Sequence, residues 1–368
     1  MKKKLIVLTT GGTGGHIFPA EAVASYLKKE SDYKLVFVTD KRVQKRISGT
    51  LATLPIHYIC ATSVTGKTLL GKFNAAVKLA YGTLQAVRVL LRLRPQLVIG
   101  FGGYASVPTV LAAQFLHIPV ALHEQNAVLG RANRLLARRT CLIATTFTPT
   151  KQIPHGTNTI QTGMPVRPQI TKKAGVPYPT DTKEFRLFIM GGSQGARAFS
   201  DILPKALVAL SPELKAKLVL TQQVRAEDMD RVQEEYRNSG IKSINLSPFF
   251  DNVPEILSET HLVISRSGSS SLAEFSALGR PALLIPLPTA ADDHQTENAR
   301  IWTANGAGWL MVEKETTPEI ITERLTSLME NPAVLLNAAE CALNTKPKTS
   351  AEKVLSDAII NILKDKKK

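Results

Sequence analysis

Short apolar runs alternate with longer amphipathic stretches along the whole 368-residue chain. In the first half these runs predict strands at 5–9, 34–38, 56–60, 96–100, 119–123 and 141–144. In the second half they predict strands at 185–190, 217–221, 243–246, 261–265 and 282–286. Apolar strands separated by helices are typical of parallel sheets that are covered on both faces. The pattern therefore predicts an α/β protein.

One supersecondary pattern occurs twice. Residues 3–27 and 185–207 each read as a strand, a Gly-Gly-polar-x-Gly turn and a helix. Two such openings predict two tandem Rossmann-like domains, with ligands at the carboxyl ends of the strands in a cleft between the domains. The expected division is an N-terminal domain, a Pro- and Lys-rich linker without apolar periodicity, a C-terminal domain, and a final helix with a basic tail. Their expected bounds are 1–166, 167–184, 185–345 and 346–368.

Composition is that of a globular protein, with 44% apolar and 21% charged residues. The three cysteines are Cys60, Cys141 and Cys341, and they form no metal-binding spacing, which favours a reducing compartment. The opening "MKKKLIVL" resembles a signal peptide, but its apolar run stops after four residues. We therefore expect no export signal and no membrane span.

Charge is distributed very unevenly. Residues 1–165 carry 21 Lys and Arg against 5 Asp and Glu, a net charge of +16, whereas 166–368 carry 25 of each. A field of this size favours a polyanionic partner, either nucleic acid or an anionic membrane, over a merely soluble surface. The stretch 66–95 predicts a basic interfacial helix, the alternative being a core-packed helix with a solvated basic face. Its basic residues are Lys67, Lys72, Lys78, Arg88, Arg92 and Arg94, and its apolar residues include Leu69, Leu70, Phe73, Leu79 and Tyr81.

The first glycine-rich turn, "TTGGTGGHIFPA" at 9–20, is followed at once by a helix. Its glycines would let the backbone approach an anion, although a tight turn alone would also require them. His16 would lie at the helix N-terminus, where the dipole lowers the pKa of an imidazole, as a general base requires. A capping or core histidine is the alternative. Glu124, in "HEQN" at the end of another predicted strand, is the competing candidate base.

The richest stretch for chemistry is 265–299, "SRSGSSSLAEFSALGRPALLIPLPTAADDHQTENA". A helix beginning near Ser271 could hold a diphosphate through its N–H groups and nearby hydroxyls without a metal ion. Glu274, one turn on, could bind a ribose diol, or could simply complement the helix dipole. The next helix would direct His294, Gln295 and Asn298 toward the same crevice. Neither Asp40 nor the Asp292–Asp293 pair forms an Asp-x-Asp metal site, so metal-independent chemistry is expected.

Several motifs together resemble one family. They are "GGTGGHIFPA", "GFGGYASVP", "HEQN", "GMPVR", "GGSQGAR" and the 265–299 stretch, in order along nearly the whole chain. The chain resembles the MurG family of bacterial peptidoglycan N-acetylglucosaminyltransferases, of glycosyltransferase family 28 type. The resemblance implies a GT-B fold and inverting transfer of N-acetylglucosamine from UDP-N-acetylglucosamine to the C4 hydroxyl of undecaprenyl-diphospho-N-acetylmuramoyl-pentapeptide. The product would be a β-linked disaccharide lipid, lipid II.

The same resemblance implies which residues take part. His16 and Glu124 are the catalytic candidates. The expected substrate-binding residues are Thr13, Gly14, Gly15, Asn126, Arg167, Ser193, Phe250, Ser269, Ser270, Ser271, Leu272, Ala273, Glu274 and Gln295. One departure is the run of three serines after Gly268, where relatives vary with Ala and Thr.

The implied partners are the nucleotide sugar, the lipid-linked acceptor and an anionic membrane surface, with other cell-wall synthesis proteins as further candidates. No cofactor, metal or nucleic acid is expected. The location would be peripheral, on the cytoplasmic face of the inner membrane, in cell-wall synthesis, cell shape and division.

Three alternatives remain open at this stage. A UDP-sugar 2-epimerase has the same type of fold but would not need a basic first half. Another lipid-acceptor glycosyltransferase would share most of the motifs. A non-catalytic nucleic-acid-binding protein would use the net charge, although few aromatic residues are interleaved with the basic ones.

Overall fold

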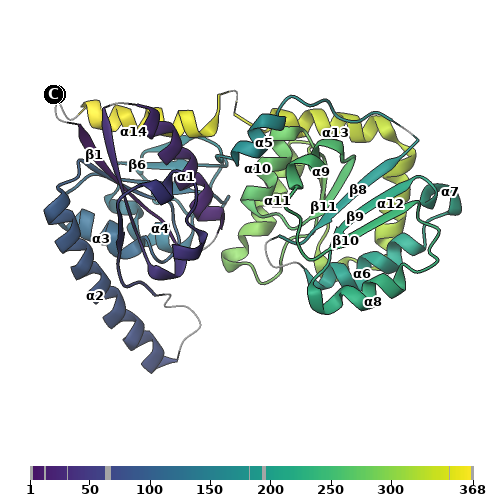
Figure 1. Ribbon diagram of the computed structural model, residues 1–368, viewed down its shortest axis with the longest axis horizontal. Helices are drawn as coiled ribbons and strands as arrows, with labels where there is room; N and C mark the ends of the chain where they lie inside the picture. Colours follow the sequence, from purple (N-terminus) through teal and green to yellow (C-terminus); the bar gives the residue numbers. More distant parts are fainter. Residues whose placement is uncertain are drawn as a thin grey trace. The chain divides into compact units, whose positions relative to one another are not determined.

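A computed structural model describes residues 3–11, 14–30, 32–62, 68–181, 183–192, 196–347 and 349–365. The chain divides into two compact units (Figure 1). Unit 1 comprises Met1–Arg167 together with Pro347–Lys368, and unit 2 comprises Pro168–Lys346. The segment 167–184, expected as a linker, contains a short helix, α5 (Pro168–Lys173).

Unit 1 is built on a seven-stranded parallel sheet with the order β3-β2-β1-β4-β5-β6-β7. The strands are β1 (Lys4–Thr9), β2 (Tyr33–Thr39), β3 (Ile56–Tyr58), β4 (Leu97–Gly100), β5 (Val120–Glu124), β6 (Leu142–Thr145) and β7 (Thr159–Gln161). Side chains alternate across the sheet, so Ile6 and Leu8 pack in one apolar cluster and Val7 in another. The sheet is therefore buried on both faces, as the continuous apolar runs predict.

Helices cover both faces of this sheet. They are α1 (Gly14–Lys29), α2 (Leu69–Leu93), α3 (Val107–Phe115), α4 (Arg131–Leu136) and α14 (Ala351–Asp365), with short 3₁₀ turns at Lys41–Arg46, Leu51–Thr53 and Ala137–Arg139. The last helix of the chain, α14, lies alongside α1 (Figure 1), and its Leu355, Ile359 and Leu363 join the same cluster as Ile6 and Leu8. On the other face α2 packs against α3.

Unit 2 is built on a six-stranded parallel sheet with the order β10-β9-β8-β11-β12-β13. The strands are β8 (Phe185–Met190), β9 (Leu218–Gln223), β10 (Ser243–Ser247), β11 (Leu262–Ser265), β12 (Ala282–Leu284) and β13 (Gly308–Leu310). Its other helices are α6 (Arg197–Val208), α7 (Pro212–Lys215), α8 (Met229–Glu235), α9 (Val253–Glu259), α10 (Ser269–Leu278), α11 (His294–Ala304), α12 (Pro318–Glu330) and α13 (Pro332–Asn344). Three 3₁₀ turns lie at Ala226–Asp228, Ala291–Asp293 and Glu313–Glu315.

Strand order reverses once in each sheet, and ligands of such sheets bind outside the carboxyl ends of the strands at that reversal. The reversal lies between β1 and β4 in unit 1 and between β8 and β11 in unit 2. The prediction of two Rossmann-like parallel-sheet domains is confirmed. The edge strands β7 and β13 were not predicted, because each has only three residues and lacks a distinct apolar run.

No helix within the described residues has both the length and the apolar character needed to cross a bilayer.

Candidate functional site

His16 lies in the first turn of α1, directly after the loop that leaves β1. Its Nδ1 is 3.0 Å from the carbonyl oxygen of Phe101, at the end of β4. A carbonyl only accepts hydrogen bonds, so Nδ1 is the protonated nitrogen. In the neutral form of the ring the lone pair is therefore on Nε2, which is the arrangement that a general base needs.

Two glycines make room for this ring. Gly102 and Gly103 have φ angles of 82° and 74°, in the left-handed region that favours glycine. A Cβ added at Gly102 would lie 3.1 Å from the imidazole of His16, and one added at Gly103 would lie 3.3 Å from it. The Cβ at Gly103 would also lie 2.9 Å from the backbone of Gly11. The turns after β1 and β4 therefore pack backbone to backbone, with His16 held against the second.

Gln125 fixes the same carbonyl from another strand. Its Nε2 donates to the Phe101 oxygen over 2.6 Å, and its side chain is buried. Its Oε1 is buried without a hydrogen-bond partner in the part of the chain that the structure describes. Gln125 was not among the predicted site residues, although it stands in the quoted "HEQN" motif. It links the ends of β4 and β5 directly beneath the candidate base.

Glu124 has a different environment. Its carboxylate accepts from the backbone N–H groups of Asn126 (3.0 Å) and Gly130 (2.9 Å) and from Nδ2 of Asn133 (2.8 Å). Burial raises the pKa of Glu124, and these donors act in the opposite direction. Because all of these contacts come from N–H donors, they suit the ionised form and occupy both oxygens. The geometry is that of a group that holds the loop carrying Asn126.

The neighbouring His123 is completely buried, and burial lowers its pKa to about 4. Its Nε2 lies 3.4 Å from the carbonyl oxygen of Gly163. This imidazole is therefore neutral at physiological pH. The His123 ring therefore contributes no positive charge beside the His16 turn.

The remaining predicted residues of unit 1 are placed only in part. Gly14 and Gly15 begin α1, and Thr13 lies outside the described residues. Arg167 is half-buried with its guanidinium 5.9 Å from the centre of the Phe18 ring.

In unit 2 the predicted residues gather on α10, which follows β11 at the strand reversal. The helix begins at Ser269 rather than near Ser271, with Gly268 as its N-cap. Ser269, Ser270 and Ser271 thus form its first turn, where backbone N–H groups lack helical acceptors and can bind an anion. Glu274 is buried one turn further on. Leu272 and Phe275, near it in the chain, are also buried, and the Phe275 ring meets Trp302 edge to face. Ala273, beside it, is half-buried, and Ser193 lies outside the described residues.

Arg266 joins the loops around this helix. Its guanidinium donates to the carbonyl oxygens of Ile285 (2.9 Å) and Pro286 (3.0 Å), and it pairs with Glu313 at 2.5 Å. It also lies 4.8 Å from the centre of the Phe199 ring on α6. One buried side chain therefore connects the loops after β11, β12 and β13. Arg266 belongs to the "SRSG" motif but was not among the predicted site residues. Glu313 belongs to none of the motifs identified in the sequence.

Gln295 links two of the same loops from the start of α11. Its backbone oxygen accepts from Oγ of Ser267 (2.7 Å), and its Oε1 accepts from the N–H of Leu287 (3.0 Å). Neither contact uses the side-chain N–H₂ group of Gln295. Asn298, one turn later, donates to the carbonyl oxygen of Ser267 over 3.0 Å. His294 instead lies 2.8 Å from the carbonyl oxygen of Ala291 in its own turn.

Phe250 follows β10 and is half-buried. Its ring meets Phe188 of β8 edge to face, with 5.9 Å between centroids. Within the residues that the structure describes, no three His, Cys, Asp or Glu side chains form a metal-binding group.

Two family models match the chain. The glycosyltransferase family 28 N-terminal domain matches residues 6–145, and the glycosyltransferase family 28 C-terminal domain matches residues 186–355. The matched ranges contain both strand reversals described above.

Curated relatives are similar over nearly the whole chain. A protein of Rhodospirillum rubrum is 50% identical over 92% of this chain and 87% of its own length, and one of Paramagnetospirillum magneticum is 44% identical over 98% of each. Both are named UDP-N-acetylglucosamine–N-acetylmuramyl-(pentapeptide) pyrophosphoryl-undecaprenol N-acetylglucosamine transferase.

Solved structures with a similar fold include a member of the same family. The crystal structure of MurG from Acinetobacter baumannii has a TM-score of 0.80 and 30% identity, covering 97% of this chain and 99% of that one. A structure from Listeria monocytogenes described as a UDP-N-acetylglucosamine 2-epimerase has a TM-score of 0.63 at 14% identity, covering 96% of this chain and 95% of that one. At that identity the second likeness concerns the fold alone.

Proposed function

The chain belongs to glycosyltransferase family 28, and on that premise we propose that it transfers N-acetylglucosamine from UDP-N-acetylglucosamine to N-acetylmuramoyl-pentapeptide carried on undecaprenyl diphosphate. It is a hexosyltransferase of peptidoglycan synthesis, and its product is lipid II. The full-length similarity to relatives of that name favours this reaction over the epimerase, for which only the fold is shared.

His16 is the general base. The C4 hydroxyl oxygen of the acceptor attacks C1 of the donor sugar, the C1–O bond to UDP breaks, and the hydroxyl proton passes to Nε2 of His16. The single observation that carries this assignment is the Nδ1 contact with the Phe101 carbonyl, because it leaves Nε2 as the basic nitrogen. One displacement inverts the configuration at C1 and gives the β product.

Glu124 is the weaker candidate base, because its two oxygens are taken up by Asn126, Gly130 and Asn133. It acts instead by folding the loop after β5, which places Asn126 beside the end of that strand. A residue with this role affects binding through the loop rather than by accepting the substrate proton.

The donor binds unit 2. The first turn of α10 receives the diphosphate through its N–H groups and the hydroxyls of Ser269, Ser270 and Ser271. Glu274 binds the ribose hydroxyls, while Gln295 and Phe250 complete the nucleotide site. A helix N-terminus also stabilises the charge that develops on the departing UDP, so no divalent ion is required for that step. Full loss of turnover in EDTA, restored by manganese, would contradict this.

The helix α2 is the membrane-facing element. Phe73, Val77, Tyr81 and Leu84 are each more than half exposed. Their spacing places them within an arc of roughly 80° on the helix surface. Of the other predicted apolar residues, Leu79 is half-buried in the unit 1 core, and the side chains of Leu69 and Leu70, like all of Lys67, lie outside what the structure describes.

Basic side chains flank this stripe. Lys72, Lys78, Arg88, Arg92 and Arg94 are all exposed on or just after α2. An apolar stripe with basic flanks lies in the interface of an anionic bilayer, with each cation contributing about 1 kcal/mol. Peripheral attachment to the cytoplasmic face of the inner membrane follows from where the lipid-linked acceptor would be met.

The decisive experiment is incubation with radiolabelled UDP-N-acetylglucosamine and a lipid I analogue. We expect label in the lipid product and none in free N-acetylmannosamine. Label released as free sugar without lipid would support the epimerase instead. A duplex DNA titration in the same buffer tests the nucleic-acid alternative, for which we expect no binding at physiological salt.

A further inference from the structure

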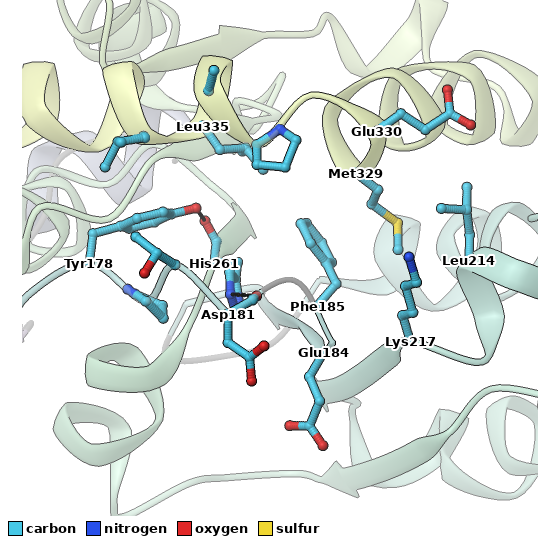
Figure 2. A pocket seen from close by; sticks show the side chains of 15 residues that line it. Tyr178, Asp181, Glu184, Phe185, Leu214, Lys217, His261, Met329, Glu330 and Leu335 are labelled. Carbon is cyan, nitrogen blue, oxygen red and sulfur yellow. Dashed lines mark hydrogen bonds between the residues drawn. The ribbon is translucent and has the colours of Figure 1, made fainter.

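A cavity of about 400 Å³ lies where strands β8, β9 and β11 of unit 2 begin. Figure 2 shows it between Tyr178, Asp181 and Phe185 on one side and the turn that joins α12 to α13 on the other. The proposed donor loops follow the opposite, carboxyl ends of the same strands. Since β8 has six residues, about 20 Å of strand separates the two places. The cavity is therefore independent of the nucleotide site.

Aromatic rings form one wall. The His261 ring stacks on Phe185 with centroids 5.6 Å apart and meets Tyr178 edge-on at 6.0 Å. His261 Nδ1 accepts from the N–H of Arg186 (3.0 Å), and Nε2 lies 3.2 Å from the carbonyl oxygen of Asp181, to which it donates. Burial lowers the pKa of His261. This wall is thus an uncharged aromatic surface, facing the apolar Met329 and Leu335.

The cavity is held open by hydrogen bonds within its wall. The Tyr178 hydroxyl donates to the carbonyl oxygen of His261 over 2.9 Å. Arg280, fully buried behind it, lies 5.7 Å from the Tyr178 ring and donates to the carbonyl oxygen of Pro177 over 3.2 Å. These contacts hold Pro177 and Tyr178 in place, so a ligand would not have to order this part of the wall, and ordering is a main cost of binding.

The rim is acidic although the chain as a whole carries +16. It holds the carboxylates of Asp181, Glu184 and Glu330 against one ammonium, that of Lys217. Glu184 is paired with Arg186 (2.7 Å) and Lys242 (2.8 Å). Among the residues that the structure describes, Asp181 and Glu330 form no ion pair, and Figure 2 shows Asp181 beside the aromatic wall. Lys217 likewise forms no ion pair among these residues, so two unpaired carboxylates stand against one unpaired ammonium, and the net unpaired charge of the lining is negative.

We propose that this cavity binds a small amphiphilic cation, with an aromatic or branched apolar body against Phe185 and His261 and an ammonium group at Asp181. The volume is that of sites for drug-sized molecules, and such sites combine apolar walls with few polar groups that set orientation. The carboxylates of Asp181 and Glu330 favour a cationic ligand, whereas Lys217 alone would favour an anionic one.

Three probes with one phenyl body test the ligand class. They are phenylethylammonium, phenylethanol and phenylacetate, titrated into the full-length protein by ligand-observed NMR. We expect the ammonium probe to bind with a Kd of about 1 mM, typical of a fragment of this size. We expect it to bind about fivefold more tightly than phenylacetate. Equal binding of all three probes, preference for phenylacetate, or no binding at 10-fold higher concentration, roughly the limit of the method, overturns the proposal.

Two pairs of variants test the location. Ala333→Trp places an indole in the cavity and is expected to abolish binding, whereas Val334→Trp, one residue along and outside the lining, leaves it unchanged. Asp181→Asn weakens the ammonium probe by about fivefold and leaves phenylethanol unaffected, while Glu323→Gln on the exposed side of α12 changes neither. Binding that survives Ala333→Trp, or that is insensitive to Asp181→Asn, contradicts the assignment. The Michaelis constant for the nucleotide sugar, measured in parallel, reports whether the tryptophan variant is folded.

Discussion

The carboxylate of Glu313 lies 2.5 Å from the guanidinium of Arg266, although 46 positions separate the two residues in the sequence. Arg266 is nearly buried, and its other N–H groups reach the carbonyl oxygens of Ile285 and Pro286. The pair thereby ties the turn before α10 to the loops after β12 and β13. We therefore expect the proposed diphosphate site to depend on Glu313, which lies outside the first turn of α10.

Glu313→Gln is expected to raise the Michaelis constant for the donor about tenfold, the equivalent of about 1.4 kcal/mol. The reason is that the neutral amide leaves Arg266 without its charge partner, so the turn before α10 is less well fixed. Steady-state kinetics at saturating acceptor measure this. Glu315→Gln, in the same turn and exposed, is the control and should match the parent. An unchanged donor constant in Glu313→Gln would remove the positioning role.

His16→Ala is expected to lower the turnover number by about 10²–10⁴ and to leave donor affinity nearly intact. The expectation rests on Nε2 being the nitrogen that receives the substrate proton. Single-turnover rates with saturating donor measure it. Glu124→Gln, which keeps the size of the side chain, is expected to affect the acceptor constant more than the rate. A normal rate in His16→Ala together with a lost rate in Glu124→Gln would exchange the two roles.

Glu274→Ala is expected to raise the donor Michaelis constant by tens-fold, since a hydrogen bond to a charged group contributes roughly 1.5–3 kcal/mol. Calorimetric titration with UDP reports the same loss directly. The neighbouring Ser276→Ala serves as a comparison on the same helix, because the Ser276 hydroxyl contacts Thr345 rather than the strand end. UDP affinity that is equal in Glu274→Ala and the parent would place the ribose elsewhere.

Unit 1 is expected to lose stability as the pH falls, because the pKa of His123 is about 4 in the folded protein. An unfolded histidine titrates near pH 6.5, so between about pH 6.5 and 4 the unfolded state binds the extra proton. The decrease in unfolding free energy is complete below the pKa of His123 in the folded protein, and it is absent above the pKa of an unfolded histidine. It amounts to about 2 kcal/mol at pH 5 and about 3 kcal/mol in total.

Urea unfolding at pH 7.5 and pH 5 measures this loss. His123→Gln should show a smaller decrease than the parent, whereas replacement of the exposed His155 should not. Equal pH dependence in His123→Gln and the parent would show that other groups cause the decrease.

Vesicle binding is expected to require anionic lipid and to fall with salt. Neutralising Lys72, Lys78, Arg88 and Arg92 should weaken it by about 1 kcal/mol per charge. Phe73→Ser and Leu84→Ser test the apolar stripe separately, and neutralising Lys215 in unit 2 is the control. Co-sedimentation measures all of these, and equal binding to neutral vesicles at high salt would contradict the electrostatic account.

Local patterns predicted most of the fold. The alternation of apolar strands and amphipathic helices located the strands of both sheets apart from β7 and β13, whose three residues do not form a pattern. The start of α10 was placed two residues late, because three serines in a row give no sign of which one lies in the helix. Loop and cap positions of this kind are set by tertiary contacts.

The candidate site was predictable only where a residue type has an evident chemical role. His16, Glu124 and Glu274 stand out in the sequence by type and motif. The supporting contacts do not, because Gln125 acts on a backbone carbonyl of another strand and Glu313 on a side chain from another loop. Predicting such contacts requires knowing which strands and loops are neighbours in the folded sheet, and the sequence of one segment does not contain that information.

The last helix of the chain has a consequence for how the protein is made. Leu355, Ile359 and Leu363 complete the apolar cluster that contains β1, so the core of unit 1 cannot close until α14 has been synthesised, long after β1. A ribosome adding 5–20 residues per second needs roughly 10–40 s to proceed from the end of the first segment of unit 1 to α14. Unit 2 is itself synthesised during that interval, while the nascent unit 1 exposes the apolar face of α1 to chaperones and proteases. A premature stop codon within α14 would therefore be expected to damage unit 1, which carries His16, more than unit 2.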